Sequence, residues 1–237
     1  MFGKFNCIII AFLCVFSSYS QIEAIEVIYS QAIGKTRDTV YTNVKKLAGM
    51  NYSLKANSTS AVFVRKKTMN NDYYAANEHY MYSSGASGIF YKNLETNEKL
   101  REEDIYGEKI LVSYPMNDLD WVITKDFKMI DDFLVYKAYS VQKEFSKTHN
   151  KEFEIVTTAW FAPKIPFSFG PRGCDGLPGL ILEASFYSGS IYFVAEKITI
   201  YSEGDKKGFD IVRPTKGKEM TFDESLIYVR KISNSGN

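Results

Sequence analysis

The chain has 237 residues, of which 45% are hydrophobic and 15% aromatic, and its 29 basic side chains nearly balance 28 acidic ones. A balanced charge gives no field that would draw nucleic acid or anionic lipid head groups to the protein. We therefore expect no nucleic-acid partner. The many Tyr and Phe residues favour strands, because aromatic side chains suit a pleated, half-buried surface.

Residues 1–20 read as a secretory signal peptide. Lys4 gives the segment a positive start, residues 7–16 form an apolar run, and small serines precede a cleavage site after residue 20. The run is shorter than the roughly 20 residues that span a bilayer, so no transmembrane anchor is expected. Residues 21–237 are then predicted to form a single β-rich domain in the periplasm, at the outer membrane or secreted.

Cysteine usage sets a further limit on this exported domain. Cys7 and Cys14 lie within the predicted signal peptide, so Cys174 would be alone in the mature chain. No intramolecular disulfide is then possible, although the compartment would permit one. We expect the fold to depend on its hydrophobic core, and the oligomeric state stays open.

In the first half of the mature chain, short segments are separated by Asn, Gly and Pro. A short helix is predicted over residues 36–47, ending near Gly49, and a polar loop over 67–77. The acidic run 102–104 reads as a charged edge or turn that discourages strand pairing. Strands are predicted over residues 24–31, as a pair within 52–65 with a turn near 57–60, and over 79–83, 88–93, 99–106 and 109–114.

Period-2 alternation is clearest in the three segments 121–129, 133–143 and 153–161, with a turn at Asp131 and Asp132. Successive short strands with little helix between them predict an all-β, mainly antiparallel fold. We expect a single curved sheet or half-barrel, similar to the lipoprotein carriers of the bacterial envelope, with one short helix. The last three strands are predicted over residues 180–187, 191–201 and 222–232.

One segment, residues 163–182, is named the Pro/Gly loop below. Proline fixes φ and glycine permits positive φ, so their close spacing specifies an ordered backbone path. The apolar residues within and beside the loop predict that it packs onto the sheet as a strap. The loop holds four of the six prolines, Pro163, Pro166, Pro171 and Pro178, interleaved with Gly170, Gly173, Gly176 and Gly179.

The stretch Gly176-Leu177-Pro178-Gly179-Leu180-Ile181 resembles the signature of the GLPGLI family, exported proteins of Bacteroidota without a known function. The resemblance runs from about residue 25 to at least residue 200. It implies export and an all-β fold, but no reaction. Many relatives have a cysteine where this chain has Val135, and they tend to have aromatic and lysine residues where it has Arg172–Asp175. Other matching positions are Trp121, Tyr136-Lys137-Ala138, Ala159-Trp160-Phe161, Pro163, Ile165-Pro166, Gly170-Pro171 and Leu182-Glu183.

Few residues of the sequence are candidates for catalysis or for metal or cofactor binding. Cys174, with Arg172 nearby, would be a nucleophile only if His79 or His149 served as its base, and no third orienting group is identified. Two histidines, one mature cysteine and no metal-ligand spacing predict no metal site, and no motif predicts a cofactor.

Three hypotheses about function stay open. The leading one is a non-enzymatic binding or assembly factor for an apolar small molecule or an envelope protein, in which the aromatic residues line a cavity. In this hypothesis Trp160, Phe167, Phe169 and Leu177 contact the ligand or partner, and Gly176, Pro178 and Gly179 hold the loop shape. The alternatives are an enzyme that depends on Cys174 and a purely structural envelope component whose aromatic residues only form the core.

Overall fold

The computed structural model describes residues 22–34, 45–66, 85–105, 107–146, 150–202 and 209–235. The predicted signal peptide, the strand over residues 79–83, His79 and His149 lie outside these ranges. The whole of the predicted loop over 67–77 lies outside them as well. Within the described part of the chain, no helix is both long and apolar enough to cross a membrane.

Twelve strands form one sheet in the order β12-β6-β5-β4-β3-β2-β1-β11-β10-β9-β8-β7. Neighbours pair antiparallel except β12 and β6, which are parallel. The sheet therefore confirms the predicted all-β, mainly antiparallel class. The strands are β1 (Ala24–Ile33), β2 (Lys45–Asn57), β3 (Ser60–Arg65), β4 (Ile89–Asn93), β5 (Glu98–Ile105), β6 (Glu108–Ser113), β7 (Val122–Ile130), β8 (Phe133–Ser146), β9 (Lys151–Ala162), β10 (Leu180–Phe186), β11 (Ile191–Tyr201) and β12 (Lys218–Thr221).

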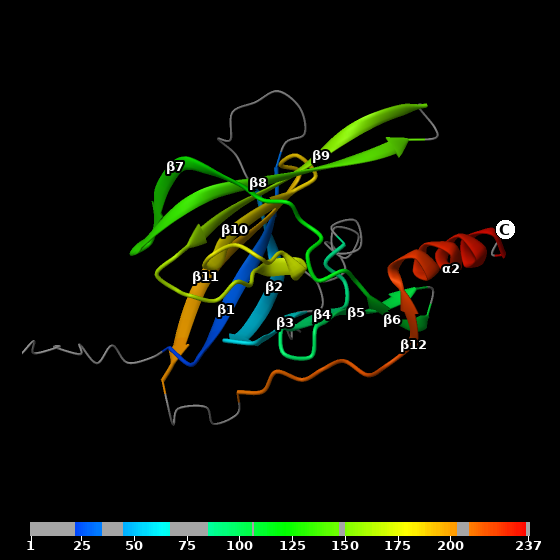
Figure 1. The fold of residues 1–237 in the computed structure, drawn as a ribbon, viewed down its shortest axis with the longest axis horizontal. Coiled ribbons are helices and arrows are strands. Elements are labelled where there is room, and N and C mark those ends of the chain that lie inside the picture. The colour runs from blue at the N-terminus through cyan, green and yellow to red at the C-terminus, as the bar shows by residue number, and fades with distance from the viewer. Residues whose placement is uncertain are drawn as a thin grey trace, which may run out of the picture.

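The sheet is bent into an open trough (Figure 1). Strands β1, β2, β10 and β11 form its middle, β7–β9 rise at one end, and β3–β6 turn away at the other. The two outermost strands, β7 and β12, do not pair with each other, so the sheet does not close into a barrel. The Pro/Gly loop, which includes the 3₁₀ turn η1 (Pro171–Gly173), lies on the concave side.

An aromatic cluster forms the centre of the core. The rings of Tyr52 and Phe63 stack with centroids 5.2 Å apart, and Phe193 meets both rings edge-on at 5.2 and 5.9 Å. Such geometries add to the free energy gained by burying the rings. The buried tyrosine hydroxyls are satisfied, since Tyr52 donates to Gln31 Oε1 at 2.7 Å and Tyr29 to the Ile181 carbonyl at 2.6 Å.

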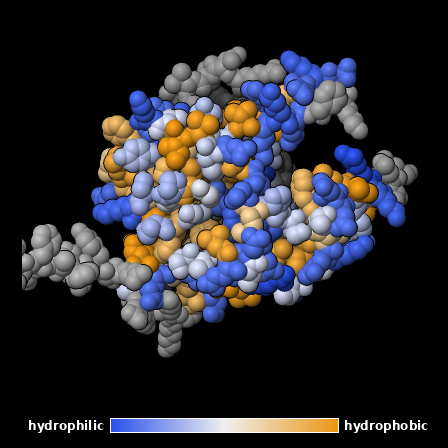
Figure 2. Space-filling view, in the orientation of Figure 1, coloured by the Kyte–Doolittle hydropathy of each residue, from blue (hydrophilic) through white to orange (hydrophobic). Residues whose placement is uncertain are grey.

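The end of the sheet formed by β7, β8 and β9 carries apolar residues outside the core. Edge strand β7 exposes Ile123, Phe127 and Met129, each of them by half or more of its surface. Figure 2 shows apolar residues among hydrophilic ones in the region where Figure 1 places β7 and β8. The outer half of the β8–β9 hairpin is also solvent-exposed. The predicted alternation therefore marks a core face along β9, where Thr157, Ala159 and Phe161 are buried. In β8 the burial changes register, from Val135 to Ala138 and Ser140, and β7 has no buried residue.

The predicted last strand is wrong, because residues Phe222–Ser235 form helix α2. Thr221 and Glu224 form a reciprocal capping box. The Thr221 N–H donates to Glu224 Oε2 at 2.8 Å, and the Glu224 N–H donates to Thr221 Oγ1 at 3.3 Å. This start signal, Thr-x-x-Glu, outweighs the β-branched residues that follow it.

Two further expectations are corrected. Residues 45–47 of the predicted helix belong to β2, and the rest of that helix lies outside the described ranges. The acidic run is not at an edge, since β5 pairs with β4 and β6. Its carboxylates have their own partners: Glu102 pairs with Lys109, Glu103 pairs with Arg101, and Asp104 accepts the Gly107 N–H.

Candidate ligand cavity

The Pro/Gly loop is held to the sheet by its own backbone. Its first turn closes when the Ile165 N–H donates to the Ala162 carbonyl at 3.1 Å. The Leu180 N–H returns to the Ile165 carbonyl and the Ile181 N–H to the Phe169 carbonyl, both at 3.0 Å. The loop therefore packs onto the sheet as the sequence predicts, and its last three residues begin β10.

Gly179 is the position that requires glycine most clearly. Its φ is +150°, and a Cβ there would lie 2.4 Å from the Ala162 carbonyl oxygen. No side chain fits at that distance without moving the end of β9. The close approach explains why the loop can re-enter the sheet directly beside β9.

A buried ion network fastens the loop to strands β4 and β5. Asp175 accepts from Lys92 at 2.6 Å and from Lys99 at 2.9 Å, and all three side chains are less than 10% exposed. Lys99 also pairs with Asp118 at 2.6 Å. Burial alone would lower the pKa of Lys99, but the two carboxylates together raise it above its ordinary value. Trp121 donates its indole N–H to the Asp175 carbonyl at 2.8 Å, so this motif residue holds the same turn.

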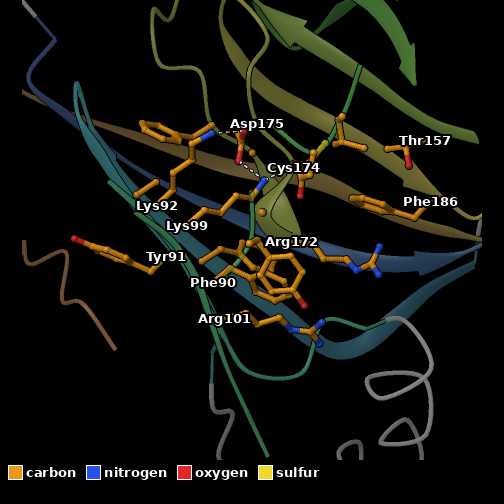
Figure 3. A pocket seen from close by; sticks show the side chains of 18 of the residues that line it. Phe90, Tyr91, Lys92, Lys99, Arg101, Thr157, Arg172, Cys174, Asp175 and Phe186 are labelled. Carbon is orange, nitrogen blue, oxygen red and sulfur yellow. Dashed lines mark hydrogen bonds and ion pairs between the residues drawn. The ribbon is translucent and has the colours of Figure 1, made fainter. Parts of the chain in front are cut away.

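The loop and the bent sheet enclose a cavity of about 350 Å³ (Figure 3). This volume lies at the lower end of the range typical of small-molecule sites. Strands β3–β5 form one wall, β8 and β9 another, and the loop segment 169–175 a third. The apolar lining comes mainly from Phe63, Phe90, Ile155, Phe169 and Phe186.

Two arginines also line this cavity. Arg101 belongs to β5, and Arg172 belongs to the 3₁₀ turn of the loop. Arg172 donates to the Tyr187 hydroxyl at 2.7 Å. Burial lowers the pKa of Arg172, the Tyr187 hydroxyl raises it, and the like charge of Arg101 lowers it, with a net shift below the ordinary value.

Cys174 lies at the cavity wall with 1% of its surface exposed. Burial raises the pKa of the thiol well above its usual range, and the negative charge of Asp175 raises it further, against the opposing effect of Lys99. The thiolate, which is the nucleophilic form, is therefore disfavoured. Both candidate bases, His79 and His149, lie outside the described residues.

The four residues predicted to contact a ligand are not gathered at one surface. Phe169 is buried and lines the cavity. Phe167 and Leu177 are buried in the core and do not line the cavity. Trp160 is half-buried on β9, and the ammonium group of Lys128 lies 4.4 Å from its ring centroid. Alternation along β9 directs Trp160 away from the cavity face, which carries Ile155 and Thr157 of the same strand.

Sequence reasoning did not identify most of the cavity lining. Phe90 and Arg101 come from β4 and β5, whereas Ile155 comes from β9, more than fifty positions away. Only the bend of the sheet brings these strands face to face. Among the described residues, no group of three or more His, Cys, Asp or Glu side chains is arranged to hold a metal ion.

A family model described as a protein of unknown function (Porph_ging) matches residues 142–183, which include the end of β8, all of β9 and the whole Pro/Gly loop. No curated protein matches the sequence.

Two crystal forms of PNGF-II are similar in fold. The first, in space group P21, shares 15% identity at a TM-score of 0.53, and the second, in space group C2, shares 13% identity at the same TM-score. Each match covers 88% of this chain and 33% of PNGF-II, so the chain spans about a third of the length of that protein. At this identity the likeness concerns the fold alone, and the chain is similar over residues 142–183 to a family of unknown function.

Proposed function

We propose that this protein is an exported, non-enzymatic binding factor of the bacterial envelope and a member of the GLPGLI family. The signal-like pattern of residues 1–20 supports export, to the periplasm or to the outer membrane and beyond. The GLPGLI stretch and the family match over residues 142–183 support the relationship.

The single observation that carries the binding function is the cavity between the Pro/Gly loop and the sheet. It is lined by aromatic and aliphatic side chains together with seven charged ones, four of which pair with one another. Sites of this kind bind apolar small molecules, which gain free energy by leaving water. The loop supports one wall through Asp175, whose ion pairs with Lys92 and Lys99 join it to β4 and β5.

The same geometry does not support the Cys174-dependent enzyme. A nucleophilic cysteine needs a stabilised thiolate and access to substrate. The Cys174 thiol has neither, since it is buried and its pKa is raised.

Phenylnaphthylamine, a neutral dye that fluoresces in apolar surroundings, tests the proposal. We expect saturable binding to the wild type and a loss of more than about ten-fold in affinity in Ile155→Trp, whose indole would fill the cavity. The matched control is Val156→Trp, on the same strand and equally half-buried, but directed to the opposite face. Equal dye binding by the two variants would contradict the proposal, and absence of binding by the wild type would favour a packed structural component.

A further inference from the structure

The two arginines at the cavity have unused hydrogen-bonding capacity. The Nε atoms of Arg101 and Arg172 are both buried and have no hydrogen-bond partner among the described residues. Leaving a buried donor unsatisfied costs free energy, more so when the group is charged. Native structures seldom leave such atoms without a partner, so water or a ligand in the cavity is expected to accept from them.

Aromatic rings hold both guanidinium groups in place. The Cζ atom of Arg172 lies 4.6 Å from the centroid of Phe186 and 5.1 Å from that of Tyr187. The Cζ atom of Arg101 lies 4.7 Å from the centroid of Phe90. Figure 3 shows Arg101, Arg172, Phe90 and Phe186 around the same space. Stacking occupies the flat face of a guanidinium and leaves N–H groups at its edge available to a ligand.

Among the residues that the structure describes, no ion pair neutralises the positive charge that Arg172 carries at the cavity. Arg101 is paired with Glu103 at 3.1 Å, and the ion network balances two lysines against Asp175 and Asp118. Within the described residues, Arg172 forms no ion pair: it donates to the Tyr187 hydroxyl, and the nearby Glu103 carboxylate is already paired with Arg101, so the two arginines together keep one positive charge in excess. The cavity also has one lining carboxylate outside these pairs, Glu144, but that residue is solvent-exposed and its charge is screened by water.

The backbone of Arg172 is also unusual. Its φ of 55° and ψ of 35° place it in the left-handed region, which costs a residue with a Cβ about 1–2 kcal/mol. The next residue, Gly173, also has positive φ, at 70°, but has no Cβ. Strained residues of this kind cluster at binding sites, where the strain directs a side chain.

We propose that Arg172 binds the acidic head of an amphipathic ligand whose apolar body fills the cavity. This inference rests on the proposed binding function and specifies its ligand class. The single uncompensated charge matches a monoanion, and the planar guanidinium fork matches a carboxylate. The ligand is therefore an apolar carboxylic acid, with its chain against Phe90, Ile155 and Phe186.

Displacement of bound phenylnaphthylamine by dodecanoate and by dodecanol tests this assignment, because the two compounds differ only in the head group. We expect the wild type to bind dodecanoate about ten-fold more tightly or better, as is typical of a charge-assisted hydrogen bond. In Arg172→Gln the preference should fall to within about two-fold, through weaker binding of dodecanoate alone. Arg172→Lys should restore part of it, because the charge returns without the fork.

The matched control is Arg213→Gln, which removes an arginine that pairs with Glu98 away from the cavity lining. It should keep the full preference for dodecanoate. Equal affinity of the wild type for both compounds, or an unchanged preference in Arg172→Gln, would overturn the assignment while leaving apolar binding intact. Failure of both compounds and of the dye to bind the wild type would instead overturn the proposed function, and this inference with it.

Discussion

Replacing Asp175 by asparagine removes the carboxylate that joins the Pro/Gly loop to β4 and β5. The variant keeps the size of the side chain but leaves two ammonium groups without their shared anion. Lys92 and Lys99 are 8% and 7% exposed, so water cannot readily take the place of the carboxylate.

Breaking a buried ion pair by removing one partner costs about 3–5 kcal/mol. We expect the lower end, about 3 kcal/mol, because Lys99 keeps Asp118 and Lys92 keeps its bond to the Met116 carbonyl at 2.7 Å. For a chain of this length that loss lowers Tm by roughly 6–12 °C.

Urea unfolding of Asp175→Asn measures this loss, with Asp118→Asn as the matched control. Asp118 is 31% exposed and meets one lysine, so its replacement should cost about 1 kcal/mol or less. The midpoint should shift with an unchanged slope, which identifies a change in stability rather than in the unfolded state. A loss in Asp175→Asn no larger than in Asp118→Asn would refute the reasoning that the buried network holds the loop.

Three further predictions concern the loop, the thiol and the helix. Gly179→Val should lower the free energy of unfolding by on the order of 1–3 kcal/mol, because its Cβ meets the Ala162 carbonyl. Gly107→Val shares the cost of a positive φ, at +84°, but has open space around its Cβ, so it should lose less in the same urea titration. Cys174 should resist maleimide in the native state and react after unfolding. Since burial raises the folded pKa of this thiol above its ordinary value of 9.0, the unfolded state releases the proton first. Stability should therefore fall as pH rises above about 9, and Cys174→Ala should lack this part of the pH dependence in thermal melts. Thr221→Ala should destabilise α2 by about 1 kcal/mol, seen as faster amide exchange in its first turn, whereas unchanged exchange would exclude a role for the cap.

The sequence predicts most of the second half of the fold, because its signals there are local. Alternation over residues 121–161 and the turn at Asp131 and Asp132 match β7, β8 and β9. The predicted segment 191–201 coincides with β11. The α2 error has an equally local cause, since the apolar residues after Thr221 favour a strand only when the Thr-x-x-Glu signal is overlooked.

The site was less accessible from the sequence. Proline and glycine spacing predicts an ordered loop, but the residues that the loop presents depend on which sheet face it covers. Phe167 and Leu177 turn into the core and Phe169 reaches the cavity, although all three are apolar residues of one loop. Arg172 faces aromatic partners at the end of β10 and in the turn after it, contacts that depend on tertiary packing.

The central claim is that the cavity holds an apolar ligand. Mass spectrometry of an organic extract, from protein purified out of its native cells without detergent, tests this claim most directly. We predict a near-stoichiometric apolar acid in the extract of the wild type, its retention in Val156→Trp and its loss in Ile155→Trp. An extract of the wild type as empty as that of Ile155→Trp would contradict the claim and leave the aromatic residues with a role in the core alone.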